Sequence, residues 1–166
     1  MSPATTTTRS LADIGVGDVL PELSIPLTRT LIVTTAIASR DYQDVHHDPS
    51  LAVERGSPDI FMNILSTNGL VGRYITDWTG PGAVIESVAI RLGAPNHPGD
   101  TMVFSGTVTS VTRPGDGDGD DGRGGDGRGR VEVAVRGANS RGDHVTGVVR
   151  VSLPATTGGT AGGSPS

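Results

Sequence analysis

The chain has 166 residues, of which 34% are hydrophobic, enough for one modest core and therefore one domain. Its net charge of -5 argues against nucleic acid or a membrane surface as a partner. It has no cysteine, which excludes disulfides, thiolate nucleophiles and cysteine-based zinc sites. Because the sequence has neither a transmembrane run nor an apolar signal core near Met1, we expect a cytoplasmic protein.

Both ends of the chain have a biased composition. Residues 1–12 are rich in Ser, Thr, Pro and Ala, and residues 154–166 are rich in Gly. Such segments bury too little apolar surface to offset the entropy lost on ordering. We therefore predict two disordered tails flanking one folded domain at residues 13–153.

The front half of the domain contains the helical signals. A short strand is predicted near residues 22–27 and a short helix near residues 34–39. A long helix is predicted to enter at Ser57-Pro58-Asp59, because Ser or Asp caps helices and Pro fits a first turn. Apolar residues then recur at three- and four-residue steps until Thr79-Gly80-Pro81-Gly82, which must end the helix.

The back half is rich in strand formers. Four β-rich runs cover residues 83–92, 101–112, 130–138 and 144–153, and two of them alternate clearly between apolar and polar residues. Turn residues separate these runs, which predicts an antiparallel meander. One long helix packed on such a sheet is an α+β arrangement, in which the sheet wraps around the helix.

A Gly-rich, charged segment at residues 114–129 interrupts the strands. Asp116, Asp118 and Asp120 have the spacing that begins an EF-hand calcium loop, but the Gly and the closing Glu of that loop are replaced. Neither flanking helices nor repeated nonapeptides are present. We therefore predict a disordered loop insertion, not a metal site.

The candidate catalytic residues are Asp41 and His46, five positions apart in one polar run. A carboxylate that accepts a proton and an imidazole that orients the same water are the minimum equipment for adding water across an activated double bond. The spacing alone occurs often by chance, so the surrounding pattern has to support it. Asp48, which precedes Pro49, is predicted to fix the loop by hydrogen bonding.

That surrounding pattern resembles a known family. Asp41-x-x-x-x-His46-x-Asp48-Pro49, followed by the helix and by Pro98-Gly99-Asp100-Thr101-Met102, is similar to the MaoC-like (R)-specific enoyl-CoA hydratases of the hot-dog fold. The resemblance covers residues 16–153 apart from the insertion. The family motif is Asp-x-Asn-Pro-x-His, and this chain keeps its first and last members.

A closer resemblance is carried by residues 38–48 and 59–65. These segments are similar to the small MaoC-type subunit of actinobacterial steroid side-chain hydratases. That resemblance implies a heteromer with a larger MaoC-containing subunit, or otherwise a homodimer. It also implies that the substrate is the CoA ester of a cholesterol-derived acid, with no further cofactor and no metal.

The resemblance also implies roles for individual residues. Asp41 and His46 would bind the water, and we assign Asp41 as the base and His46 as the orienting group and proton donor, although a coupled pair need not divide so neatly. Where family members carry His-Gly at the helix start, this chain has Met62-Asn63. The Asn63 backbone N–H is therefore the candidate donor to the thioester oxygen, aided by the helix N-terminus.

Two other functions stay open at this point. A hot-dog thioesterase would place its carboxylate on or beside the central helix, where Asp59 is the candidate. A structural subunit without chemistry of its own is the second alternative. Arg55, Arg73 and Arg91 are the candidates for contacts with the CoA phosphates.

Overall fold

The computed structural model describes residues 7–115 and 127–155. Five strands form one antiparallel sheet in the order β1-β3-β4-β5-β2. Their bounds are Val19–Pro26 (β1), Val84–Leu92 (β2), Thr101–Thr112 (β3), Arg128–Asn139 (β4) and Gly142–Pro154 (β5). The helices are Arg29–Ala38 (α1), Pro49–Glu54 (α2) and Ile64–Thr79 (α3), with single 3-10 turns at Leu11–Asp13 (η1) and Asp44–His46 (η2).

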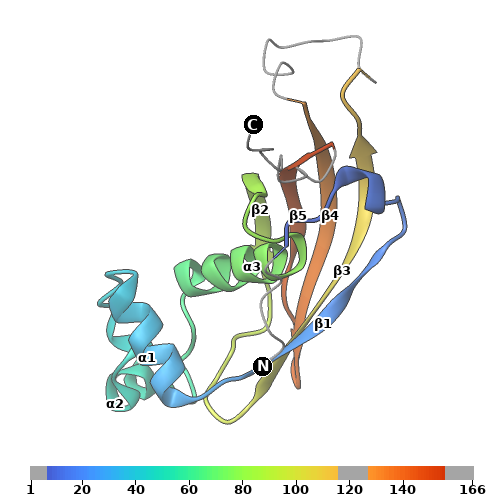
Figure 1. Cartoon of the computed structure of the whole chain (residues 1–166). Coiled ribbons are helices and arrows are strands. Elements are labelled where there is room, and N and C mark those ends of the chain that lie inside the picture. The colour runs from blue at the N-terminus through green and yellow to red at the C-terminus, as the bar shows by residue number, and fades with distance from the viewer. Residues whose placement is uncertain (1–6, 116–126, 156–166) are drawn as a thin grey trace.

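The sheet curves around α3, while α1 and α2 form a separate lobe beyond the N-terminal end of that helix (Figure 1). This arrangement confirms the predicted α+β class with one long central helix. None of the described helices is long and apolar enough to cross a membrane.

Alternation along the strands separates the two faces of the sheet. Every second residue is buried from Met102 to Val108 in β3 and from Gly129 to Gly137 in β4, including Phe104 and Val133. On the other face, Arg150 forms an ion pair with Glu132 across the strands at 2.6 Å. The period of two therefore produces one apolar face for α3 and one charged face for solvent.

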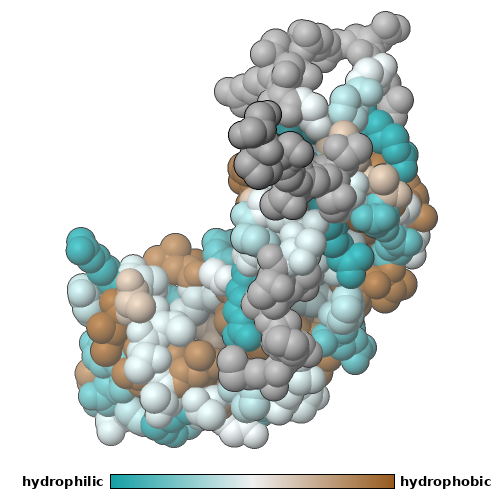
Figure 2. All heavy atoms as spheres, in the orientation of Figure 1, coloured by the Kyte–Doolittle hydropathy of each residue, from teal (hydrophilic) through white to brown (hydrophobic). Residues whose placement is uncertain are grey.

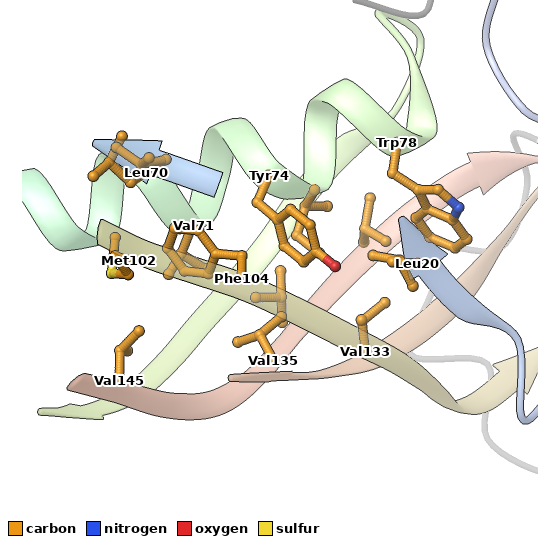
Figure 3. Close-up of a cluster of buried hydrophobic side chains, with 14 of the residues drawn as sticks. Leu20, Leu70, Val71, Tyr74, Trp78, Met102, Phe104, Val133, Val135 and Val145 are labelled. Carbon is orange, nitrogen blue, oxygen red and sulfur yellow. The ribbon is translucent and has the colours of Figure 1, made fainter. Parts of the chain in front are cut away.

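Helix α3 packs on the apolar face through side chains spaced three and four residues apart (Figure 3). The Tyr74 ring stacks on Phe104, with centroids 5.3 Å apart. A Cβ atom added at Gly106 would lie 3.2 Å from Cε1 of Tyr74. The absence of a side chain at this strand position therefore lets the helix lie close to the sheet.

The predicted start of the long helix at Ser57-Pro58-Asp59 is wrong, because α3 begins only at Ile64. The preceding residues give their backbone groups to other segments. The Phe61 N–H donates to the Val45 carbonyl at 3.1 Å, and the Met62 N–H donates to the Asn96 carbonyl at 3.0 Å. These long-range bonds hold the segment extended until Asn63 caps the helix.

The predicted meander is correct for β3, β4 and β5 but wrong for β2. Strand β2 pairs with β5, so it forms the sheet edge opposite β1. After β2, the N–H groups of Gly93 and Ala94 donate to the carbonyls of His144 and Asp143, both at 2.8 Å. The chain therefore stays with β5 before it crosses to β3.

The folded region also begins earlier than predicted. Residues 7–12, expected to belong to a disordered tail, pack onto the domain, and Leu11 is 1% exposed. The Arg9 N–H donates to the Thr79 carbonyl, and the Ser10 hydroxyl donates to the Ala155 carbonyl. Two other predicted boundaries are also wrong, because β5 runs to Pro154, at the start of the predicted C-terminal tail, and β4 begins at Arg128, inside the predicted insertion. Residues 1–6, 116–126 and 156–166 lie outside the described residues.

Candidate active site

Asp41 is positioned by the end of α1. The helix closes with a Schellman motif, in which the Asp41 N–H donates to the Ala36 carbonyl and the Arg40 N–H donates to the Ile37 carbonyl. Arg40 has φ 56°, the left-handed conformation that this motif requires. A residue with a side chain adopts it at a cost of about 1–2 kcal/mol. The motif fixes the backbone of Asp41 directly after the turn.

His46 lies on η2 with its ring orientation fixed. Its Nδ1 is 2.7 Å from the Phe61 carbonyl, and because a carbonyl only accepts, Nδ1 carries the proton of this bond. Its Nε2 lies 3.4 Å from Oδ2 of Asp41. The His46 and Asp41 side chains are 8% and 21% exposed. Nε2 is therefore the nitrogen available to exchange a proton at the site.

The side chain of Asn63 joins this pair from the start of α3. Its Nδ2 donates to Oδ2 of Asp41 at 2.9 Å and to the Ser39 hydroxyl oxygen at 3.0 Å. The Asn63 bond is the largest cause that lowers the pKa of Asp41, while burial acts in the opposite direction. The Gln43 N–H and the charge of His46 lower this pKa further. Asp41 is therefore ionised at neutral pH, the state in which a carboxylate can accept a proton.

The sequence predicted a role for the backbone N–H of Asn63 but not for its side-chain amide, which contacts Asp41. Within the part of the chain that the structure describes, no acceptor pairs with the Asn63 N–H, so the backbone donor is still available. The amide contact with Asp41 spans 22 residues of sequence. No local spacing reveals such a contact. An uncharged polar residue just before an apolar helix was the one available signal, since such residues cap helices.

Asp48 fixes the loop without touching the Asp41–His46 pair. Its carboxylate accepts the N–H groups of Ser50 and Leu51 at 2.9 and 3.1 Å, which makes it the N-cap of α2. Its own N–H donates to the Asp44 carbonyl at 2.8 Å. Asp48 thus connects η2, which carries His46, to the next helix.

The acid considered for thioesterase chemistry is already engaged. Asp59 forms a bidentate ion pair with Arg29, with N–O distances of 3.0 and 2.7 Å. This pair is the main cause that lowers the pKa of Asp59. The carboxylate paired with an imidazole is Asp41 instead.

Two of the three arginines considered for phosphate contacts have acidic partners. Arg55 pairs with Asp44 at 2.7 Å and Arg73 pairs with Asp77 at 3.2 Å. Arg91 is exposed on the edge strand β2. Among the described residues, no group of three or more His, Cys, Asp or Glu side chains is arranged to hold a metal ion.

The buried His144 is held by hydrogen bonds at both of its ring nitrogens, near the start of α3. Its Nδ1 donates to the Ala94 carbonyl at 2.8 Å, so its Nε2 accepts the Thr67 hydroxyl at 2.9 Å. Burial lowers the pKa of His144 below 6.5. The neutral imidazole thus links β5, the segment after β2, and α3.

This pKa predicts acid sensitivity. The unfolded chain binds a proton at His144 more readily than the native protein, so the free energy of unfolding should fall as the pH falls below about 6.5. Asp41 and Asp59 contribute only at lower pH, because their pKa values lie below 3.8. Urea unfolding between pH 7.5 and 5.5 should show a shallower pH dependence in His144→Gln than in wild type. The exposed His47→Gln variant is the control, and an unchanged slope in His144→Gln would contradict the assignment.

A sheet wrapped around one helix, with an acid and an imidazole converging beside the helix N-terminus, defines an enzyme of the hot-dog hydratase class. No family model matches the sequence, but an individual known protein supports this class. A curated relative from Mycobacterium tuberculosis, the 3-oxo-4,17-pregnadiene-20-carboxyl-CoA hydratase beta subunit, is 50% identical over 138 residues, which cover 83% of this chain and 95% of the relative.

Two solved structures are also similar to this chain. The ChsH1-ChsH2 complex from Mycobacterium tuberculosis contains a chain with 50% identity and a TM-score of 0.72, matched over 84% of this chain and 98% of that one. The unliganded R-hydratase PhaJ1 from Pseudomonas aeruginosa shares the fold at 20% identity, with a TM-score of 0.75 and coverage of 91% and 89%. This chain belongs to the MaoC-like hydratase family, alongside the mycobacterial beta subunit.

Proposed function

We propose that this chain is the water-activating subunit of an enoyl-CoA hydratase that acts on a steroid CoA thioester. The 50% identical relative is named for 3-oxo-4,17-pregnadiene-20-carboxyl-CoA. In that compound the 17-ene joins C17 to C20, the carbon that carries the thioester carbonyl, so it is a 2,3-enoyl thioester. The observation that carries the proposal is the Asp41–His46 pair, with Oδ2 and Nε2 3.4 Å apart.

In this mechanism one water is bound by Oδ2 of Asp41 and Nε2 of His46. Asp41 takes a proton from the water while the water oxygen attacks the β carbon. Negative charge then develops on the thioester oxygen. The backbone N–H of Asn63, at the N-terminus of α3, stabilises that charge. In the reacting state His46 carries a proton on each ring nitrogen, and Nε2 gives its proton to the α carbon. A proton passing from Asp41 to His46 then restores the pair.

We further propose that the chain works in a heteromer. The relative is named a beta subunit, and the 50% identical structure is a complex of two proteins. Hydrophobic surface is visible over the lobe of α1 and α2 (Figure 2). Ile37, Val53, Ile64 and Leu65, on the three helices around the site, are 52%, 58%, 48% and 49% exposed. A second MaoC-type subunit that covers them would also supply room for a bulky acyl group.

The test is a hydration assay on the chain alone and on the chain co-purified with a larger MaoC-type subunit. Loss of enoyl-thioester absorbance would be followed for a 17-ene steroid CoA ester and for linear enoyl-CoAs. The proposal predicts hydration of the steroid by the complex and little by the chain alone. Full activity of the chain alone on short linear substrates, with none on the steroid, would favour a generic homodimeric hydratase.

A further inference from the structure

We infer that the side chain of Asn63 is a positioning residue, which fixes one oxygen of Asp41 against His46 and keeps that carboxylate available as the base. The inference rests on the proposed hydration and adds a role to the Asn63 side chain. It is independent of the backbone N–H of the same residue.

The orientation of the Asn63 amide follows from its neighbours. The Ser66 N–H can only donate, so the atom that faces it at 2.8 Å is the amide oxygen. The amide nitrogen must then face Ser39 and Asp41. The Ser39 hydroxyl gives its own proton to the carbonyls of Thr35 or Ala36, at 2.8 and 3.0 Å, so its oxygen accepts from Asn63.

Every polar group of the Asn63 side chain is therefore committed to one partner. The residue is 2% exposed, so water does not compete for these bonds. One N–H is used by Ser39, the other by Oδ2 of Asp41, and the oxygen is used by the helix cap. The amide cannot rotate without breaking the cap of α3, which makes it a rigid support for Asp41.

The two oxygens of Asp41 are held unequally. Oδ2 accepts the Asn63 amide at 2.9 Å and faces His46, whereas among the described residues Oδ1 accepts the Gln43 N–H alone, at 3.4 Å. One lone pair of Oδ2 is thus used by Asn63, and the other is left for the water shared with Nε2. Asn63 selects which oxygen acts as the base.

The supporting amide comes from the helix and not from the motif loop. Gln43 stands where the family motif has Asn, yet its side chain is exposed and it reaches Asp41 only through its backbone. The side-chain amide that contacts Asp41 therefore comes from Asn63, 22 residues away in the sequence.

Few charged groups surround Asp41, so a change in its titration can be assigned to a small number of neighbours. His46 is the titratable group within ion-pair distance of Asp41 among the described residues. Arg40, its neighbour in sequence on the α1 side, is exposed. The first turn of α3 has no acidic residue. A change in the pH dependence of Asn63 variants would therefore report on the Asp41–His46 pair.

The test compares Asn63→Gly, Asn63→Ser and Asn63→Asp in the hydratase complex. All three keep the backbone N–H, and Ser and Asp also keep a side-chain cap for α3. We expect kcat to fall by about 10–100-fold with KM little changed, because the base loses its alignment. We also expect the acidic limb of the kcat/KM profile to move to higher pH, furthest in Asn63→Asp, where a second carboxylate faces Asp41.

Asn139→Asp is the matched control. Asn139 donates to Pro95 and to Asn96 at 3.1 and 2.8 Å, so this variant loses comparable hydrogen bonds away from Asp41. It should lower the melting temperature without moving the pH profile. Wild-type kcat and an unmoved acidic limb in folded Asn63→Ser or Asn63→Gly would overturn the inference and leave the hydratase proposal standing. Failure of the wild-type complex to hydrate any enoyl-CoA would instead reject the proposed function.

Discussion

Replacing Asp41 by asparagine is expected to lower kcat for hydration by about 10²–10⁴-fold, the usual contribution of a general base. Asparagine keeps the size of the side chain but cannot accept the proton of the water. Circular dichroism and assembly with the partner should be unchanged, because Asp41 is on the site surface and not in the hydrophobic core. Steady-state kinetics of the purified complex measures the effect.

Asp44→Asn is the matched control for that experiment. Asp44 lies in the same loop, and its carboxylate pairs with Arg55 at half-exposed positions. Exposed ion pairs contribute only about 0–1 kcal/mol to stability. This variant should therefore retain hydration. Near-wild-type kcat in Asp41→Asn would remove Asp41 from the mechanism.

Testing His46 requires a substitution that removes Nε2 while keeping a donor in the place of Nδ1. His46→Ala removes both, and it leaves the Phe61 carbonyl without its donor. In His46→Asn the side-chain amide can replace Nδ1 as the donor to Phe61, while Nε2 is lost. Both variants should lose turnover by orders of magnitude, but His46→Asn should keep more of the stability.

Replacing Phe104 by alanine is expected to cost about 3–5 kcal/mol of the free energy of unfolding. Phe104 is fully buried in β3, stacks on Tyr74 of α3 and lies against the bare backbone of Gly137. Its removal leaves a cavity between helix and sheet that neither element can fill without moving. Denaturant unfolding of the purified chain gives the value.

The control for this loss is Val19→Ala, because Val19 is 73% exposed. Surface substitutions of this kind usually change stability by less than about 0.5 kcal/mol. A cost below about 1 kcal/mol in Phe104→Ala would mean that the interface between α3 and the sheet repacks readily.

The sequence predicted what depends on local order. The strand β3 has the predicted bounds, and the other back-half strands differ by only one or two residues, because alternation and turn residues are local signals. The closeness of Asp41 and His46 could be expected for the same reason, since five residues separate them. Their convergence needs only the end of α1 and the single turn η2.

The errors concern features that depend on distant segments. The helix-entry signals lie at residues 57–59, but the N–H groups of Phe61 and Met62 after them donate to the carbonyls of Val45 and Asn96. The position of β2 beside β5 depends on how the chain crosses the sheet. The alternation of apolar and polar residues along a strand does not determine which strand it pairs with. The amide of Asn63 reaches Asp41 for the same kind of reason. Spacing along the chain gives no measure of such contacts.

The central claim is that Asp41 and His46 act together on one water. The most direct measurement is kcat of Asp41→Asn, His46→Asn and the double variant in the hydratase complex, with the steroid enoyl-CoA as substrate. Residues that act as one unit give non-additive losses, so the double variant should be about as slow as the slower single variant. Losses that multiply in the double variant would show that the two residues act independently and would contradict the account.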